Sequence, residues 1–412
     1  MTIDTLGTMA AGSTGGQRIR LGFSLIGDGK WRGGLTYQRT LLETISTTMS
    51  DTVEAILFVT EEQLKLANET FGTTLDVPIV VDERVAGAGS GPRAVMALAT
   101  GRDGAFEALM RENSVDVVFE TARFYGRSFG LPCLSWIPDF QHRHLPMLFS
   151  RAGWWRREIG FQVQTHFSRK RIVMLSSENA RTDCERFYPK SRGHTRVVRF
   201  APAINVEAMR SRNAQAVAQY ALPKRYFYLP NHFWAHKNHA VVLNALRILR
   251  KDGTLDEVHP VVMSGPTMDS RDPTLFKRTM DKAKAEGLGP WFRHLGLIDF
   301  DDVLTLNAGA VALINPSKFE GWASSIEEAK ALGTPMVLSN IGVHREQQPS
   351  ARFFDPDDPS ELAQILLSVS RNLSKEHEKV EVLRDAAEYR ISAFSTALMS
   401  AIHDAHALGR NE

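Results

Sequence analysis

Residues 315–343 read NPSKFEGWASSIEEAKALGTPMVLSNIGV, and the pattern of this stretch decides the fold class. The apolar run GAVALI at residues 309–314 precedes it and is typical of a buried strand. After a polar loop, a helical pattern begins at Ile326 and runs to Gly333, where Gly-Thr-Pro ends it. A second apolar run, residues 336–338, predicts another strand. Together these features predict a strand–loop–helix–strand unit of an α/β domain.

This unit carries the groups that an anion-binding crevice needs. Its loop has one carboxylate, Glu320, and the first turns of its helix have two more, Glu327 and Glu328. The backbone N–H groups of residues 322–325 lie at the start of the helix, where unpaired donors and the helix dipole favour an anion such as phosphate. Because ligands of open α/β sheets bind beyond the carboxyl ends of the strands, we expect these groups to share one crevice. The alternative is a helix whose acidic residues merely favour its N-terminus.

The composition of the chain indicates a globular protein of two domains. Its 412 residues are too many for one ordinary core and suit two domains of roughly 200 residues each. A net charge of +2 gives no global field that would attract nucleic acid, so no nucleic-acid partner is expected. Cys133 and Cys184 lack metal-ligand spacing and favour a reduced cytoplasmic protein. No apolar run approaches the roughly 20 residues that span a bilayer, and residues 1–17 lack the features of a signal peptide.

Short apolar runs alternate with helical patterns along the rest of the chain, which indicates parallel sheets with crossover helices. Strands are expected at residues 19–26, 55–60, 78–81, 115–120, 133–137, 171–176, 196–201, 226–229, 261–265 and 293–297. Residues 202–224 are predicted to be a linker zone, and residues 373–408 are predicted to be mainly helical.

The 315–343 stretch resembles the signature of the retaining nucleotide-sugar glycosyltransferases of family 4, also called glycosyl transferases group 1. That signature has Pro-Ser, then Glu-Gly-aromatic, then a second Glu eight residues after the first, and finally a Gly-x-Pro turn. The matching residues here are Pro316, Ser317, Glu320, Gly321, Trp322, Glu328, Ala329, Gly333 and Pro335. The later segment GVHRE at residues 342–346 adds to the resemblance.

The resemblance implies the GT-B architecture, in which two doubly wound Rossmann-like domains face each other across a cleft. Residues 1–17 would be a disordered lead-in, and residues 18–205 the acceptor-side domain. Residues 206–388 would bind the nucleotide sugar, and residues 389–412 would form a helix that crosses back to the first domain.

The resemblance also implies roles for residues of the second domain. Glu320 would hold the transferred sugar as a catalytic residue, and Glu328 would accept hydrogen bonds from the ribose. Lys237 matches a lysine that binds the donor diphosphate, while His232 stands where the family commonly has arginine. The other predicted diphosphate-binding positions are Gly321, Trp322, Ala323, Ser324 and Ser325.

Two stretches of the first domain complete the predicted site. Gly33 and Gly34 resemble the paired glycines that face the donor phosphates, although their loop is also compatible with an ordinary turn. Asp139 matches the Asp of a His-Asp pair beside the transferred sugar, but Pro138 stands where that His would be. His142 is the candidate that would supply the imidazole instead. A capping or core histidine is the alternative.

By resemblance, the expected activity is transfer of a hexose or deoxyhexose with retention, the first candidate being mannose from GDP-mannose. The acceptor would be a glycan or lipid-linked saccharide in cell-surface polysaccharide synthesis. Neither a metal nor another cofactor is expected. The alternatives are a sugar-nucleotide epimerase or phosphorylase on the same fold, or a non-catalytic subunit.

Residues 149–171 combine Trp154 and Trp155 with a series of arginines and a lysine. Such a helix is suited to rest on anionic lipid, which would place the protein peripherally at the inner face of the plasma membrane. The alternative is that the tryptophans pack inward and the arginines form a solvated face.

Overall fold

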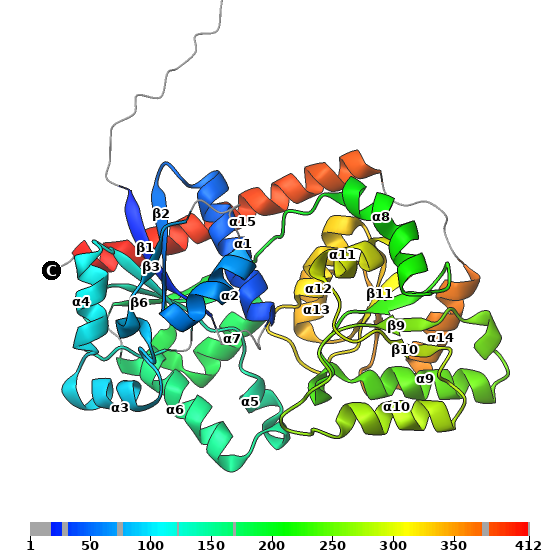
Figure 1. Ribbon diagram of the computed structural model, residues 1–412. Coiled ribbons are helices and arrows are strands. Elements are labelled where there is room, and N and C mark those ends of the chain that lie inside the picture. The colour runs from blue at the N-terminus through cyan, green and yellow to red at the C-terminus, as the bar shows by residue number, and fades with distance from the viewer. Residues whose placement is uncertain are drawn as a thin grey trace, which may run out of the picture.

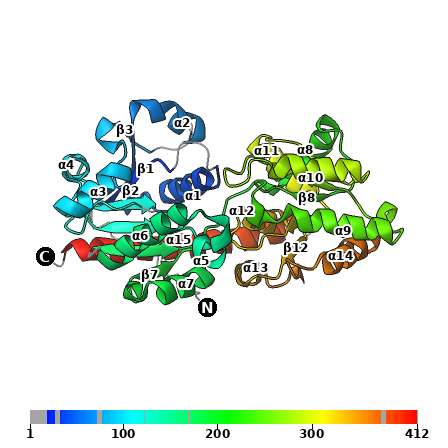
Figure 2. The ribbon, with the colours of Figure 1, turned by 90° about the horizontal axis from the view of Figure 1, so that it is seen from below.

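The computed structural model describes residues 18–26, 32–71, 77–121, 123–167, 170–372 and 379–410. These residues form two α/β domains that lie side by side, and one long helix, α15 (Val380–Arg410), runs along both of them (Figures 1 and 2). Each domain is built on its own parallel sheet. The predicted fold class, two doubly wound α/β domains, is therefore confirmed.

The first domain has a sheet of seven parallel strands in the order β3-β2-β1-β4-β5-β6-β7. Its strands are β1 (Ile19–Ser24), β2 (Val53–Val59), β3 (Ile79–Val81), β4 (Val117–Thr121), β5 (Cys133–Trp136), β6 (Arg171–Leu175) and β7 (Thr195–Val197). Its helices are α1 (Arg32–Thr48), α2 (Glu61–Phe71), α3 (Gly91–Thr100), α4 (Gly104–Glu112), α5 (Gln141–His144), α6 (Arg151–Phe167) and α7 (Glu178–Phe187).

The second domain has a sheet of six parallel strands in the order β10-β9-β8-β11-β12-β13. Its strands are β8 (Phe227–Leu229), β9 (Val261–Met263), β10 (Phe292–His294), β11 (Ala312–Asn315), β12 (Met336–Ser339) and β13 (Arg352–Phe354). Its helices are α8 (Val206–Gln219), α9 (His239–Lys251), α10 (Leu275–Ala285), α11 (Phe300–Gly309), α12 (Ser324–Leu332), α13 (Gly342–Gln347) and α14 (Pro359–Arg371).

The apolar runs of the strands bury both faces of each sheet. In β2, Leu57 packs into a core cluster that also contains residues of α1 and α15. Its neighbours Ile56 and Phe58 belong to a separate cluster with residues of α4. Because successive side chains of a strand point to opposite faces, a continuous apolar run is what a sheet covered on both sides requires.

Helix α8 corrects one prediction from the sequence, because residues 202–224 are not a linker throughout. Asn205 caps α8 by accepting a hydrogen bond from the backbone N–H of Ala208, and Met209 packs beside Leu304 of α11. The helix was missed because most of its apolar residues are alanines and its larger ones are few, so its amphipathic pattern is weak. The chain passes between the domains just before this helix.

Helix α15 ties the two domains together. Leu383, near its start, would meet an added Cβ at Gly333 of the second domain at 2.8 Å. Further along, Phe394, Leu398 and Ile402 are buried in the main core cluster of the first domain. Together with the polypeptide before α8, this helix makes a second covalent connection, so the domains are tethered on the side away from α5 (Figure 1).

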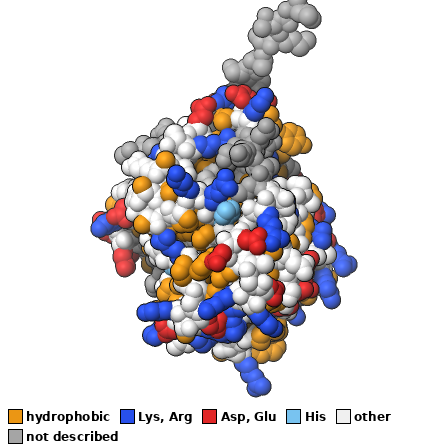
Figure 3. Space-filling model, turned by 90° about the vertical axis from the view of Figure 1, so that its right-hand side faces the viewer, with side chains coloured by type: hydrophobic (Ala, Val, Ile, Leu, Met, Phe, Trp, Pro, Cys, Tyr) orange, Lys and Arg blue, Asp and Glu red, His pale blue; other side chains and the backbone are white. Residues whose placement is uncertain are grey.

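The surface of the molecule carries both signs of charge. On the side that bears the second domain, Lys and Arg side chains are interspersed with Asp and Glu (Figure 3). No helix in the described part of the chain is long and apolar enough to cross a bilayer.

Candidate active site

A cavity of about 260 Å³ lies between the two domains and is lined by residues of both. It opens at the carboxyl ends of β1, β5, β8 and β11, where loops leave the strands and helices begin. The predicted site residues that line it are Gly33, Asp139, His232, Lys237, Glu320, Gly321, Trp322, Ala323, Ser324, Ser325 and Glu328. The loop that resembles the family signature, the loop around Lys237 and the facing loops of the first domain thus meet at one cavity.

Helix α12 presents its N-terminus to this cavity. Its N-cap residue, Ala323, makes no side-chain capping bond, so the first N–H groups are not satisfied in the usual way. The N–H of Ala323 donates to Oε1 of Gln347 at 3.0 Å. The N–H groups of Ser324 and Ser325 are therefore the helix-terminal donors best placed for an anion.

Glu320 and Lys237 form an ion pair in the cavity wall, and their side chains are 9% and 14% exposed. Nζ of Lys237 donates to Oε1 of Glu320 at 2.6 Å, and the hydroxyl of Ser317 donates to the same oxygen at 2.6 Å. Burial by itself raises the pKa of Glu320, but the neighbouring Lys237 charge and these hydrogen bonds lower it to about 2. Glu320 is therefore ionised at neutral pH.

A series of buried, hydrogen-bonded polar groups fixes the position of Glu320. The Ser317 hydroxyl also lies 2.7 Å from Oδ1 of Asn315, which in turn accepts from Nδ2 of Asn231 at 3.3 Å. The carbonyl of Ser317 accepts from the Ser339 hydroxyl, which lies 3.1 Å from Nδ1 of His344. The Pro-Ser pair of the signature therefore helps to hold the Glu320 carboxylate in place, in addition to forming part of the loop.

Glu328 is in a different environment from Glu320. Its side chain lines the cavity from the second turn of α12, and it is 5% exposed. Burial raises the pKa of Glu328 to about 7, with only a hydrogen bond from Ser324 opposing it. Glu328 therefore titrates near neutral pH, and a ligand with hydroxyl donors would favour its ionised form.

The first domain contributes an aromatic wall that the sequence reading did not single out. The rings of Tyr37 and Trp136 stack with centroids 3.9 Å apart, and Phe200 packs edge-on against Tyr37. All three line the cavity, as does Ser176, whose hydroxyl accepts from Nε1 of Trp136. Two features of the sequence could have indicated this wall: a tyrosine four residues after Gly33, and a tryptophan at the end of a buried strand.

Gly321 allows the two domains to approach each other closely. A Cβ added at Gly321 would lie 1.9 Å from the carbonyl oxygen of Pro138 and 3.0 Å from Cβ of Asp139. Only glycine fits such an approach. The signature loop therefore lies directly against the Pro138–Asp139 turn of the first domain.

Asp139, His232 and Gly33 also line the cavity. Asp139 lines the cavity and accepts a hydrogen bond from the N–H of Gln141 at 3.0 Å. His232 lines the opposite wall, with its ring 4.4 Å from that of Trp234. Gly33, in the first turn of α1, is exposed at the cavity, whereas residues 27–31 of its loop lie outside the described residues.

Gly34 and His142 are not among the residues that line the cavity. Gly34 is buried in the first turn of α1. His142 is fully buried, and its Nε2 lies 3.2 Å from Oε2 of Glu158 within a polar cluster that includes Arg143 and Tyr188. The structure therefore corrects the catalytic role predicted for His142 to a core role, because its ring is packed inside the domain.

Comparisons with known proteins match this architecture. Residues 213–388 match the model of the family described as glycosyl transferases group 1. A segment of 167 residues, 40% of this chain, is 28% identical to the O-antigen chain mannosyltransferase B of Escherichia coli and covers 42% of that relative. The match thus spans less than half the length of either protein.

Solved structures share the fold along nearly the whole chain. A glycosyltransferase from Rickettsia africae has a TM-score of 0.68 at 13% identity, covering 96% of this chain and 100% of its own. Anabaena Alr3699/HepE, solved with UDP and glucose, has a TM-score of 0.64 at 14% identity, covering 93% and 99%. WaaG, a glycosyltransferase involved in lipopolysaccharide biosynthesis, has a TM-score of 0.57 at 13% identity, covering 92% and 98%. Residues 213–388 of this chain are thus similar to the glycosyl transferases group 1 family, and its two domains have the GT-B fold of such glycosyltransferases.

Proposed function

We propose that this protein is a retaining glycosyltransferase that takes a hexose or deoxyhexose from a nucleoside diphosphate sugar. Mannose from GDP-mannose is the first candidate donor. The acceptor is a glycan or lipid-linked saccharide in cell-surface polysaccharide synthesis. The observation that carries the proposal is one cavity that holds the Lys237–Glu320 pair, the N-terminus of α12 and the buried carboxylate of Glu328. The names of the mannosyltransferase relative and of WaaG, and the UDP and glucose bound to Alr3699/HepE, support the same class of reaction.

The donor diphosphate is neutralised by the protein alone. Its negative charge meets the ammonium of Lys237 and the N–H groups of Ser324 and Ser325. These donors are fixed before the reaction, so they stabilise the charge that develops on the leaving diphosphate without reorganisation. We propose on this ground that transfer requires no divalent cation.

The two carboxylates act on different parts of the donor. Glu328 accepts from the ribose hydroxyls, which do not change during the reaction. Glu320 lies beside the Pro138–Asp139 turn and holds the sugar, where charge changes as the glycosidic bond breaks. Interactions of the first kind set affinity, and those of the second kind set the rate of the chemical step. The aromatic wall of Tyr37 and Trp136 faces the acceptor.

The proposal also includes peripheral contact of the first domain with a membrane. Trp154 is partly held inside, since its Nε1 donates to the carbonyl of His142, but Trp155 and Ile159 on α6 are 58% and 55% exposed. Helix α3 lies beside α6 (Figures 1 and 2) and exposes Val95, Met96 and Leu98. With exposed Arg151 and Arg156, this face suits an anionic lipid surface.

The proposed reaction is tested directly by incubating the full chain with GDP-mannose or UDP-glucose and a saccharide acceptor. We expect release of nucleoside diphosphate that depends on the acceptor, a product with the donor's anomeric configuration, and undiminished rates in EDTA. Loss of activity in EDTA with recovery in Mn²⁺ would refute the metal-independent part. A new sugar nucleotide formed without acceptor would indicate an epimerase, and no turnover of any donor would indicate a non-catalytic subunit.

Glu328→Gln is expected to weaken binding of the free nucleoside diphosphate by about 1.5–3 kcal/mol at pH 8, because a charged acceptor is lost. The difference from the native protein should shrink as pH falls through about 7, where Glu328 takes up a proton.

The raised folded-state pKa of Glu328 also means that its ionised form lowers the stability of the folded protein, and this loss grows from about pH 4.5 to pH 7. The unliganded variant should therefore be more stable at pH 8 than the native protein by up to about 3 kcal/mol. Calorimetry and urea unfolding at pH 5 and pH 8 measure both effects, and equal binding by the two proteins at pH 8 would contradict the ribose role.

Glu320→Gln is expected to lower kcat by roughly tenfold or more, because the sugar loses its charged partner in the transition state. Affinity for the free nucleoside diphosphate should stay equal or increase, since Lys237 keeps its contact with the phosphates and no longer shares its charge with Glu320. Steady-state rates beside calorimetry with the free diphosphate separate the two quantities. Weaker diphosphate binding, comparable with that of Glu328→Gln, would show that the roles of the two carboxylates are not divided in this way.

The membrane face is tested by sedimentation with vesicles of phosphatidylglycerol and phosphatidylcholine. Binding to anionic vesicles should weaken at high salt, because the arginine attraction is screened. Replacing Trp155 and Arg156 together by Ser should weaken it further and leave nucleoside diphosphate binding unchanged. Arg247→Ser, which replaces an exposed arginine of the second domain, is the control and should leave vesicle binding unchanged. Equal binding to neutral and anionic vesicles, or none to either, would rule out this face.

A further inference from the structure

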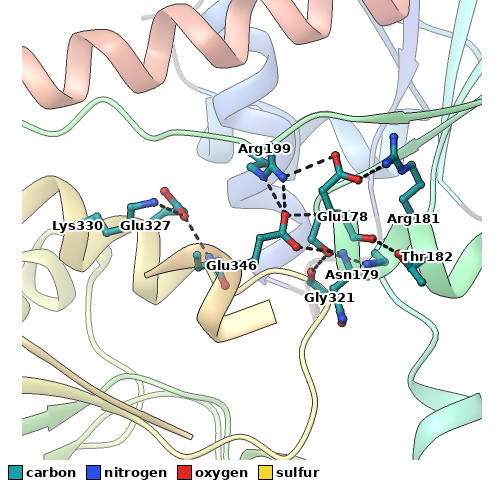
Figure 4. A network of polar contacts seen from close by, with 12 residues as sticks. Glu178, Asn179, Arg181, Thr182, Arg199, Gly321, Glu327, Lys330 and Glu346 are labelled. Atoms are coloured by element: carbon teal, nitrogen blue, oxygen red, sulfur yellow. Dashed lines mark hydrogen bonds and ion pairs between the residues drawn. The ribbon is translucent and has the colours of Figure 1, made fainter. Parts of the chain in front are cut away.

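The cleft has a polar connection between its walls that lies outside the cavity. Glu346 belongs to α13 of the second domain, and its carboxylate reaches the first turn of α7 in the first domain (Figure 4). The backbone N–H groups of Glu178 and Asn179 donate to its two oxygens at 2.8 and 3.0 Å. Glu346 is the last residue of the GVHRE segment, to which the proposed reaction assigns no task.

Arg199 completes this contact from the chain that follows β7. Its Nε and Nη2 donate to Oε1 of Glu346 at 3.0 and 2.7 Å. The carboxylate thus receives four hydrogen bonds, two from an arginine and two from a helix N-terminus, where unpaired N–H groups and the helix dipole favour negative charge. The nearby carboxylate of Glu178 is paired with Arg181 at 2.6 Å, so it does not oppose Glu346 alone.

The same turn of α7 also holds the signature loop. Ser177 caps the helix by accepting from the N–H of Ala180 at 2.9 Å, and its hydroxyl donates to the carbonyl of Gly321 at 3.2 Å. A Cβ added at Gly342 would lie 2.7 Å from Nδ2 of Asn179. One turn of the first domain therefore contacts both ends of the 321–346 segment of the second.

These contacts set the distance between the two walls of the cavity. Gly321 adjoins Glu320, lies against Pro138 and accepts a hydrogen bond from Ser177 of the first domain. The contacts of α7 with the second domain therefore determine how far the Pro138–Asp139 turn lies from the sugar that Glu320 is proposed to hold. Two-domain proteins of this size move about their linkers unless a strong interface holds them. The Glu346 contact is polar and its side chain is 17% exposed, so water can replace its hydrogen bonds when the domains separate.

We propose that Glu346 is a positioning residue that holds the closed arrangement of the two domains in which transfer occurs. It does so by binding the N-terminus of α7 and Arg199, and it touches neither donor nor acceptor. This inference rests on the proposed glycosyl transfer for its kinetic consequence, whereas its structural consequence concerns the unliganded protein.

The structural test compares the native protein with Glu346→Gln and Arg199→Ala by small-angle X-ray scattering without ligand. Gln keeps the shape but loses the charge, and its amide NH2 group would face backbone N–H groups. Both variants should show a larger radius of gyration. Arg371→Ala removes an arginine that pairs with Glu257 inside the second domain, away from α7, and should match the native protein. Unchanged scattering in both variants would overturn the proposal, whatever the enzyme's activity. Circular dichroism distinguishes an opened protein from an unfolded one.

The kinetic test uses the same variants in the transfer assay. If the closed state falls to about one molecule in ten, the transfer rate falls about tenfold. Affinity for free nucleoside diphosphate should change less than about threefold, since most of its predicted partners lie in the second domain. The double variant should lose little more than either single one, because Arg199 acts through Glu346. Opened scattering with an unchanged transfer rate would refute the positioning role. Absence of transfer in the native protein would instead count against the proposed function and leave the scattering result to decide the contact itself.

Discussion

The ion pair between Lys237 and Glu320, which is largely shielded from water, constrains the polar groups of the loop that joins β11 to α12. Removing two charges from water is costly, and in a buried site the attraction between them offsets this cost only when their remaining hydrogen bonds are satisfied. Ser317 supplies one such bond, and Asn315 and Asn231 hold Ser317 in turn. The conformation of the loop between β11 and α12 is therefore stabilised by the hydrogen bonds that the Glu320 carboxylate requires.

The two carboxylates of the signature show how environment divides chemistry between identical groups. Glu320 has a cation at 2.6 Å and a pKa lowered to about 2, while Glu328 has no such partner and a pKa raised to about 7. The first is a permanent charge at the proposed sugar position. The second changes charge near neutral pH, so binding of a donor in the proposed orientation would be coupled to proton release.

The geometry of closure depends on small residues as much as on charges. Gly321 meets the carbonyl of Pro138, and Gly342 meets the side chain of Asn179, at distances that a Cβ would not permit without movement. Between these two points, Ser177 and Glu346 add hydrogen bonds to the first turn of α7. On the other side of the cleft, Arg271 donates to Gln141 at 3.2 Å, and the ring of His144 stacks on Phe319. The interface is thus a set of discrete polar and aromatic contacts, as expected for domains that move relative to each other.

The sequence by itself determined the fold class and the part of the cavity that belongs to the second domain. Continuous apolar runs alternating with helical patterns specify two covered parallel sheets, and the carboxyl ends of parallel strands always gather at one edge. Glu320, Glu328 and the start of α12 could therefore be located by their order alone. Tertiary structure decided what depends on contacts between distant segments: that His142 is packed beside Glu158, that residues 206–219 form a helix on α11, and that Glu346 binds α7. Local patterns report the face that a segment buries, but they do not report which other segment covers it. For that physical reason the residues that line the cavity from the loop before α12 and its first turns could be expected from the sequence, whereas their pKa values and the contacts between the domains followed only from the folded chain.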